Sequence, residues 1–218
     1  MKPHHHIDVS TLIGYSAGAL PQGFAAVVAS HLQICAICRS QLRNANQIGG
    51  QLLRQQEGQP LAADARDRML ERVIGEQQVG DDSASPPGSR HPDALPLPLQ
   101  PYFGTRYSDL RWRMLAPGVH HIRAVGVDDS HLMLLRTAPG KSIPLHTHGS
   151  NELTMILRGA YDDCLGHFAP GDVADLDNEI EHQPVTAPGA PCVCVAATDA
   201  PLRFSGWLAR TLQPLFGL

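Results

Sequence analysis

The stretch from Ala29 to Arg39, ASHLQICAICR, organises the first part of this chain, because three of its side chains can bind a transition metal. His31 is followed by Cys35 and then by Cys38, in the pattern H-x3-C-x2-C. On a helix these residues fall on one stripe, and a turn at Cys35 would equally let both thiolates reach one ion. Zinc takes four nitrogen or sulfur ligands in a tetrahedron. We therefore predict a structural zinc site, with the fourth ligand drawn from the three histidines at positions 4–6.

Two other interpretations of this stretch stay open. Cys35 and Cys38 can be a C-x-x-C redox pair, and His31 can be a hydrogen-bonded histidine within a buried helix. The redox motif normally follows a strand and opens a helix in a βαβ unit, and no strand-like sequence precedes Cys35. The zinc site is therefore the preferred hypothesis.

Three helical segments are expected around this site. Residues 9–18 predict a short helix with Ser10 as its N-cap. A second helix follows, with Pro21 in its first turn. A third runs from about 35 to 56, and the glycine pair at 49–50 predicts a kink or break in it.

A fourth helix is expected over residues 61–78, where apolar residues recur at helical period opposite charged ones. Four short helices give a marginal core, and metal binding can supply the missing folding free energy. We expect the apolar stripe of the fourth helix to pack on this bundle. Docking into a groove of a partner protein is the alternative.

The composition changes after residue 80. Residues 81–100 are rich in Pro, Ser and Asp and have no periodicity, which is typical of a linker. The predicted division is a helical zinc-binding domain over 1–80, a Pro-rich linker over 81–100 and a second domain over 101–218.

The second domain is predicted to be all β. Short apolar runs such as HLMLLRTAPG, ELTMILRGAY and PCVCVAATD are separated by turn residues at roughly regular spacing. This pattern indicates an antiparallel β-sandwich or barrel, closed by a last strand and a short helix near the C-terminus. Cys192 and Cys194 share one strand face and are expected in the barrel core. The fold class is therefore two domains, α then β.

A second candidate metal site lies in this β region. His146 and His148 alternate along a strand and so project to the same face. Glu152 follows a turn and can return a carboxylate to that face, and His182 lies downstream. Three histidines and one carboxylate suit zinc, iron, manganese or nickel. Exposed histidines on a turn are the alternative interpretation.

Composition argues against several classes of protein. The 218 residues carry a net charge of −4, and neither half is basic, so no electrostatic footprint for nucleic acid is present. No apolar run reaches the length of about 18 residues that spans a membrane, and the first residues lack the apolar segment of a secretory signal. Five cysteines, two of them in metal-ligand spacing, fit a reducing cytoplasm.

The β region resembles the cupin family. Residues 140–159 match every fixed position of the first cupin box, G-x5-H-x-H-x3-E-x6-G. The second box, G-x5-P-x-G-x2-H-x3-N, matches at Gly171 and His182 only. The resemblance implies a small double-sheet β-barrel, with a divalent metal inside that would be zinc first and iron, manganese or nickel as alternatives. The implied ligands are His146, His148, Glu152 and His182.

The N-terminal pattern resembles zinc-binding anti-sigma factors. The two parts in this order, joined by a Pro-rich linker, are similar to the ChrR subgroup over essentially the whole chain. That resemblance implies a cytoplasmic regulator, not an enzyme, which binds an extracytoplasmic-function (ECF) sigma factor one to one and contacts neither nucleic acid nor membrane. Its cupin domain would sense oxidative stress, notably singlet oxygen. The implied zinc ligands are His6, His31, Cys35 and Cys38.

Two other functions are alternatives to this one. A metal-dependent cupin dioxygenase with a helical oligomerisation domain is permitted by the cupin ligands, but it has no need of a zinc domain. A metal-storage protein is disfavoured because two sites per chain are sparse. The sensing element is also open, since thiolates bound to zinc can themselves be oxidised.

Overall fold

The structure is a computed structural model of the 218-residue chain. It describes residues 2–58, 60–76, 91–127, 130–144, 146–148, 151–177, 180–199 and 202–204, with the backbone alone for 146–148 and 202–204.

The first two helices form as expected, but their caps differ from the prediction. Helix α1 spans Val9–Ser16 and its N-cap is Asp8, whose Oδ1 accepts a hydrogen bond of 2.8 Å from the backbone N–H of Ser10. The prediction of Ser10 as N-cap is therefore wrong, because an aspartate two residues earlier satisfies that N–H. Helix α2 spans Gln22–Leu32, and Pro21 is its N-cap residue rather than part of its first turn.

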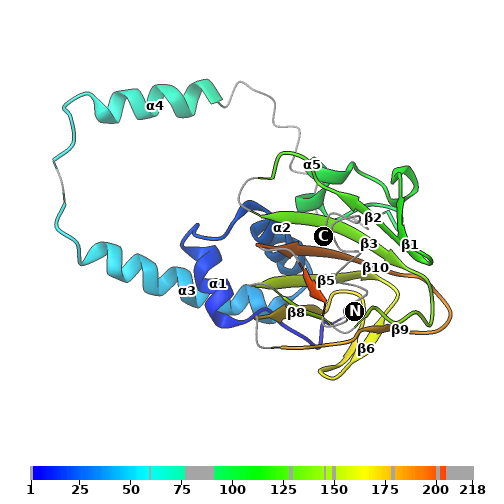
Figure 1. Ribbon diagram of the computed structural model, residues 1–218. Helices are drawn as coiled ribbons and strands as arrows, with labels where there is room; N and C mark the ends of the chain where they lie inside the picture. The colour runs from blue at the N-terminus through cyan, green and yellow to red at the C-terminus, as the bar shows by residue number, and fades with distance from the viewer. Residues whose placement is uncertain are drawn as a thin grey trace.

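Helix α3 spans Ala36–Arg54 and runs without a break through Gly49 and Gly50. The predicted kink is wrong, because glycine lowers helix stability by only about 1 kcal/mol per residue and does not by itself end a helix. Helix α4 spans Ala65–Glu76. Figure 1 shows α3 and α4 projecting away from the strands, with α4 well apart from the other helices.

The apolar side chains of α4 stay exposed, so the expectation that they pack on the helical bundle is wrong. The exposed fractions are 69% for Met69 and 60% for Ile74. The apolar stripe of this helix is present, but no described part of the chain covers it, which leaves the alternative of a partner protein.

The strands form three antiparallel groups. Six strands make the main sheet in the order β1-β2-β3-β10-β5-β8, three make a second sheet in the order β7-β6-β9, and β11 pairs with β4. The bounds are β1 Arg113–Ala116, β2 Val119–Arg123, β3 His131–Thr137, β4 His146–His148, β5 Glu152–Arg158, β6 Tyr161–Asp163, β7 Gly166–Phe168, β8 Val173–Leu176, β9 Val185–Thr186, β10 Cys192–Thr198 and β11 Leu202–Phe204.

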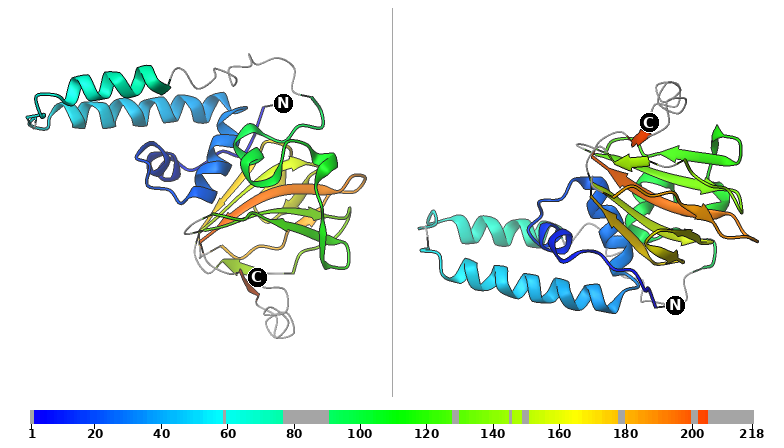
Figure 2. Two further views of the ribbon diagram at one scale, coloured as in Figure 1. Left: turned by 90° about the horizontal axis from the view of Figure 1, so that it is seen from above. Right: turned by 60° about the horizontal axis from the view of Figure 1, so that its bottom comes forward.

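Side chains alternate between the two faces of the main sheet, as a period of two requires. One face packs against α2 (Figure 2), where Phe24 and Val28 join Leu134 and Val195 in a single buried cluster. The other face lines the interior between the sheets. The expected fold class, helices followed by a cupin-type β domain, is confirmed, and the helical part shares its core with the sheet.

The second half of the predicted linker packs on the protein. A short 3-10 helix, η1 (Leu97–Leu99), runs into α5 (Gln100–Phe103), and η2 (Tyr107–Asp109) precedes β1. Leu95 and Leu99 are buried. Residues 77–90 lie outside the described residues, and the division at 80 and 100 stays a prediction.

The expected closing strand near the C-terminus is β11, which pairs with β4. The short helix predicted after it lies outside the described residues. Among the described helices, none combines the length and apolarity needed to cross a bilayer.

Candidate metal centres

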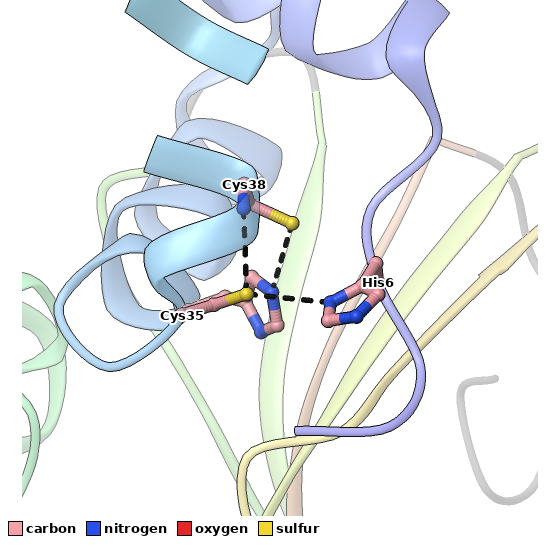
Figure 3. A group of neighbouring side chains, drawn as sticks. His6, Cys35 and Cys38 are labelled. Carbon is pink, nitrogen blue, oxygen red and sulfur yellow. Dashed lines mark hydrogen bonds between the residues drawn. The ribbon is translucent and has the colours of Figure 1, made fainter. Parts of the chain in front are cut away.

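Four side chains that the sequence predicts to be metal ligands meet where α2, α3 and residues 2–8 come together. We call residues 2–8, which precede α1, the N-terminal segment. One ligand atom from each of His6, His31, Cys35 and Cys38 lies within 4.8 Å of the other three. The Nε2 of His31 is 3.2 Å from the Sγ of Cys38, and the Nδ1 of His6 is 3.3 Å from the Sγ of Cys35. Figure 3 shows His6 approaching the two cysteines from the N-terminal segment.

This arrangement fits a tetrahedral zinc ion. Zinc–sulfur bonds of about 2.3 Å and zinc–nitrogen bonds of about 2.0–2.1 Å place sulfur and nitrogen ligands roughly 3.6 Å apart. The two nitrogen–sulfur distances in the cluster lie close to that value. Two thiols and two imidazoles are also the donor set of many structural zinc sites.

The chain reaches this geometry through a turn rather than along one helix. Helix α2 ends at Leu32, and Cys35 is the N-cap of α3, where its Sγ accepts a hydrogen bond from the backbone N–H of Cys38. His31 and the cysteines therefore lie on two helices whose ends meet. Of the two arrangements that the spacing allows, the turn at Cys35 is the one found.

The electrostatics of the cluster favour metal binding over thiol redox chemistry. Cys35 and Cys38 are buried, and burial raises the pKa of Cys38 to about 11, so without a cation its thiol stays protonated. A redox cysteine needs a lowered pKa and exposure. The C-x-x-C pair also follows a helix rather than a strand. Burial lowers the pKa of His31, which keeps its ring in the neutral form that binds metals.

The cluster lies directly against the turn between β7 and β8. The Nδ1 of His31 is 2.9 Å from the carbonyl oxygen of Gly171. Asp172 is 1% exposed, and its Oδ1 accepts hydrogen bonds from the backbone N–H groups of His4 and His5. Burial raises the pKa of Asp172, but hydrogen bonds from backbone N–H groups outweigh it, and the net pKa is lowered. No sequence pattern indicates these contacts, which join residues about 140 to 170 positions apart.

The second candidate site is described in part. Glu152 and His182 are both buried and line one cavity of about 80 Å³ between the sheets. The Oε1 of Glu152 accepts a hydrogen bond of 2.8 Å from Thr154. His146 and His148 lie on β4, of which the structure describes the backbone alone. That these four residues bind one metal stays a prediction.

Asp163 is a residue of this site that the sequence interpretation missed. Its carboxylate is fully buried, and its Oδ2 lies 3.0 Å from the Nδ1 of His182. A carboxylate that holds one ring nitrogen of a histidine leaves the other for a metal. The acidic pair Asp162 and Asp163, ahead of a turn, was the available signal in the sequence. Only the fold brings Asp163 to His182.

Cys192 and Cys194 face the same cavity from β10, as expected of residues in the barrel core. Burial raises the pKa of Cys192 to about 12 and that of Cys194 well above its ordinary value. Both are therefore protonated, unreactive thiols at neutral pH.

Comparisons with known proteins cover nearly the whole chain. Residues 102–200 match the family model of the ChrR cupin-like domain. The chain is 37% identical over 216 residues to the anti-sigma-E factor ChrR of Cereibacter sphaeroides, which covers 99% of each protein. It is also similar to a chain in the crystal structure of Rhodobacter sphaeroides SigE in complex with the anti-sigma ChrR. That match has a TM-score of 0.72 and 33% identity, and covers 91% of this chain and 99% of the other.

Proposed function

This chain belongs to the ChrR family of anti-sigma factors, and we propose that it binds an ECF-type sigma factor one to one and keeps it from RNA polymerase. The proposal includes a cytoplasmic location. It makes the protein a regulator rather than an enzyme. The observation that carries it is that the two helices that project from the body of the protein each expose a set of apolar side chains.

We call these side chains the α3–α4 surface. On α3, Leu53 is 69% exposed, and several neighbouring apolar side chains are similarly uncovered. Exposed patches of this kind are typical of sites that bind another protein, and an amphipathic helix presents such a face to a groove in its partner. The members of the surface are Ile48, Leu52 and Leu53 on α3 and Met69, Leu70, Val73 and Ile74 on α4.

The N-terminal metal centre would set the direction of α3. Its four ligands come from the N-terminal segment, the end of α2 and the start of α3, so one ion would join all three. Because α2 is anchored on the main sheet, zinc would fix α3 relative to the body of the protein. Loss of zinc would then release α3 and weaken partner binding.

The cupin-like part is proposed to be the sensor, with oxidative stress such as singlet oxygen as the signal. His146, His148, Glu152 and His182 would hold a second divalent metal in the cavity between the sheets. We propose separately that this metal is zinc, and iron, manganese and nickel are the alternatives.

The test is capture of the tagged full chain from its native cytoplasm, with identification of bound proteins by mass spectrometry. Leu53→Asp and Ile74→Asp should each abolish recovery of a sigma factor, because a charge in an apolar contact is costly. Val125→Asp is the matched control, since Val125 is 90% exposed but lies on the cupin-like part.

Metal dependence is tested in the same assay. Cys38→Ser should lose zinc and the sigma factor together, whereas Cys164→Ser, at an exposed cysteine outside the cluster, should lose neither. If no sigma factor is recovered with any form of the protein, the proposal is wrong. Oxygen uptake that Glu152→Gln abolishes would then support the cupin dioxygenase.

A further inference from the structure

We propose that the turn between β7 and β8, residues 169–172, positions both histidine ligands of the N-terminal metal centre, so that the geometry of this centre depends on the cupin-like part. The inference rests on the proposed function, because it takes the cluster of His6, His31, Cys35 and Cys38 to be a metal centre. It adds a direct connection between the two parts that does not pass through the linker.

The first histidine is held by the turn through its ring. His31 is completely buried, and its Nδ1 lies 2.9 Å from the carbonyl oxygen of Gly171. A carbonyl can only accept, so Nδ1 must carry the proton, and the lone pair of Nε2 is left for a metal. That Nε2 faces the Sγ of Cys38 at 3.2 Å. The turn thus selects both the tautomer and the direction of this ligand.

The second histidine is held through its backbone. His6 belongs to a segment that precedes α1 and has no helix or strand of its own. The carboxylate of Asp172 accepts hydrogen bonds from the N–H groups of His4 and His5. On the other side of His6, the N–H of Asp8 donates to the Oδ2 of Asp175 at 3.0 Å. Two carboxylates from one short stretch of the β domain therefore fix the chain on both sides of this ligand.

Asp172 also fixes the turn itself. Its Oδ2 accepts a hydrogen bond of 2.8 Å from the N–H of Ala169. One buried side chain therefore bonds to the turn with one oxygen and to the N-terminal segment with the other. A movement of the turn must either carry the segment with it or break hydrogen bonds to a buried carboxylate, which is costly.

The same stretch reaches the wall of the cupin cavity. Strand β8 begins at Val173, directly after the turn, and ends at Leu176. Leu176 pairs with Glu152, which lines the cavity. A single four-residue strand thus joins the surroundings of a predicted cupin ligand to the surroundings of two predicted zinc ligands.

The test uses the full chain loaded with Co²⁺, whose thiolate-to-metal absorption reports the cysteine-containing centre. The measured quantity is the rate at which this absorption is lost after excess EDTA is added. Asp172→Ala should speed the loss about 10-fold, the low end of the 10–100-fold effect of removing a direct hydrogen-bond partner of a metal ligand, because Asp172 bonds the backbone beside His6 and not His6 itself. It should also shift the visible cobalt bands. Asp109→Ala is the matched control at an aspartate on η2 and should behave as wild type.

Asp172→Asn separates positioning from a general effect on folding. Its amide oxygen can still accept from His4 and His5, but its NH₂ group cannot accept from Ala169, so its release rate should lie between wild type and Asp172→Ala. If both variants release cobalt at the wild-type rate with unchanged spectra, the inference is wrong, even where the sigma factor is still captured. Wild-type protein without a thiolate–cobalt band would overturn the inference and the proposed metal centre together.

Discussion

The Nδ1 of His31 and the carbonyl oxygen of Gly171 lie 2.9 Å apart, although 140 residues separate them in the chain. This close approach depends on glycine. Gly171 has φ +99°, and a Cβ added there would lie 2.8 Å from the Cδ1 of Ile34, in the connection between α2 and α3. The glycine that matches the second cupin box therefore also allows the helical part to sit against the turn.

Replacement of Gly171 should lower stability for two reasons, its positive φ and the close approach of Ile34. Gly171→Ala adds backbone strain of about 1–2 kcal/mol, and the side chains of Ile34 and Pro3 must shift to admit the methyl group. It should therefore lower the free energy of unfolding measured in urea by more than the strain alone. Gly189→Ala is the matched control, because Gly189 has φ +101° and nothing within 4 Å of an added Cβ. Equal losses in the two variants would contradict the steric part of the explanation.

Asp163 should matter for the cupin site and not for the N-terminal one. Asp163→Ala leaves the Nδ1 of His182 without its buried carboxylate and should weaken binding of the second metal equivalent about 10–100-fold. The measurement is a Zn²⁺ titration against a chromogenic chelator. The neighbouring Asp162, whose side chain is 60% exposed and lies beside His167, provides the control Asp162→Ala. A similar loss with the control would contradict a specific role for Asp163.

Asp175 makes stability depend on pH. Burial and the nearby carboxylate of Asp8 raise the pKa of Asp175 above its ordinary value of 3.8. The stability that this group contributes is therefore complete below pH 3.8 and is lost as the pH rises through its folded-state pKa. Asp175→Asn, which keeps an acceptor for the N–H of Asp8, should be more stable than wild type at neutral pH. The difference should shrink on acidification, and urea unfolding curves that show a pH-independent difference would contradict it.

The core shared by α2 and the main sheet predicts cooperative unfolding. Phe24 is 6% exposed in that core, and Phe24→Ala should cost about 3–5 kcal/mol. Because Trp112 packs on the same cluster, Phe24→Ala should move the midpoint of unfolding followed by tryptophan fluorescence to a lower urea concentration. An unchanged fluorescence midpoint would show that α2 unfolds independently of the sheet.

The sequence was informative where spacing alone determines structure. The H-x3-C-x2-C pattern and the alternation of the strands are local, and both were identified. The sequence was less informative about contacts between segments that lie far apart in the chain. Nothing near Asp163 or Asp172 indicates which histidine each would approach, because that depends on the packing of the sheets. The apolar stripe of α4 was also recognised, but periodicity shows which face is apolar and not what covers it.

Strand β8 places a limit on how related chains can diverge. Its outer face carries Asp175 toward the N-terminal segment, and its inner face carries Leu176 beside Glu152. Because side chains alternate with a period of two, one inserted or deleted residue between 172 and 176 would reverse both faces at once. We therefore expect substitutions to be tolerated along this strand, while insertions and deletions accumulate in the loops around it and spare its length.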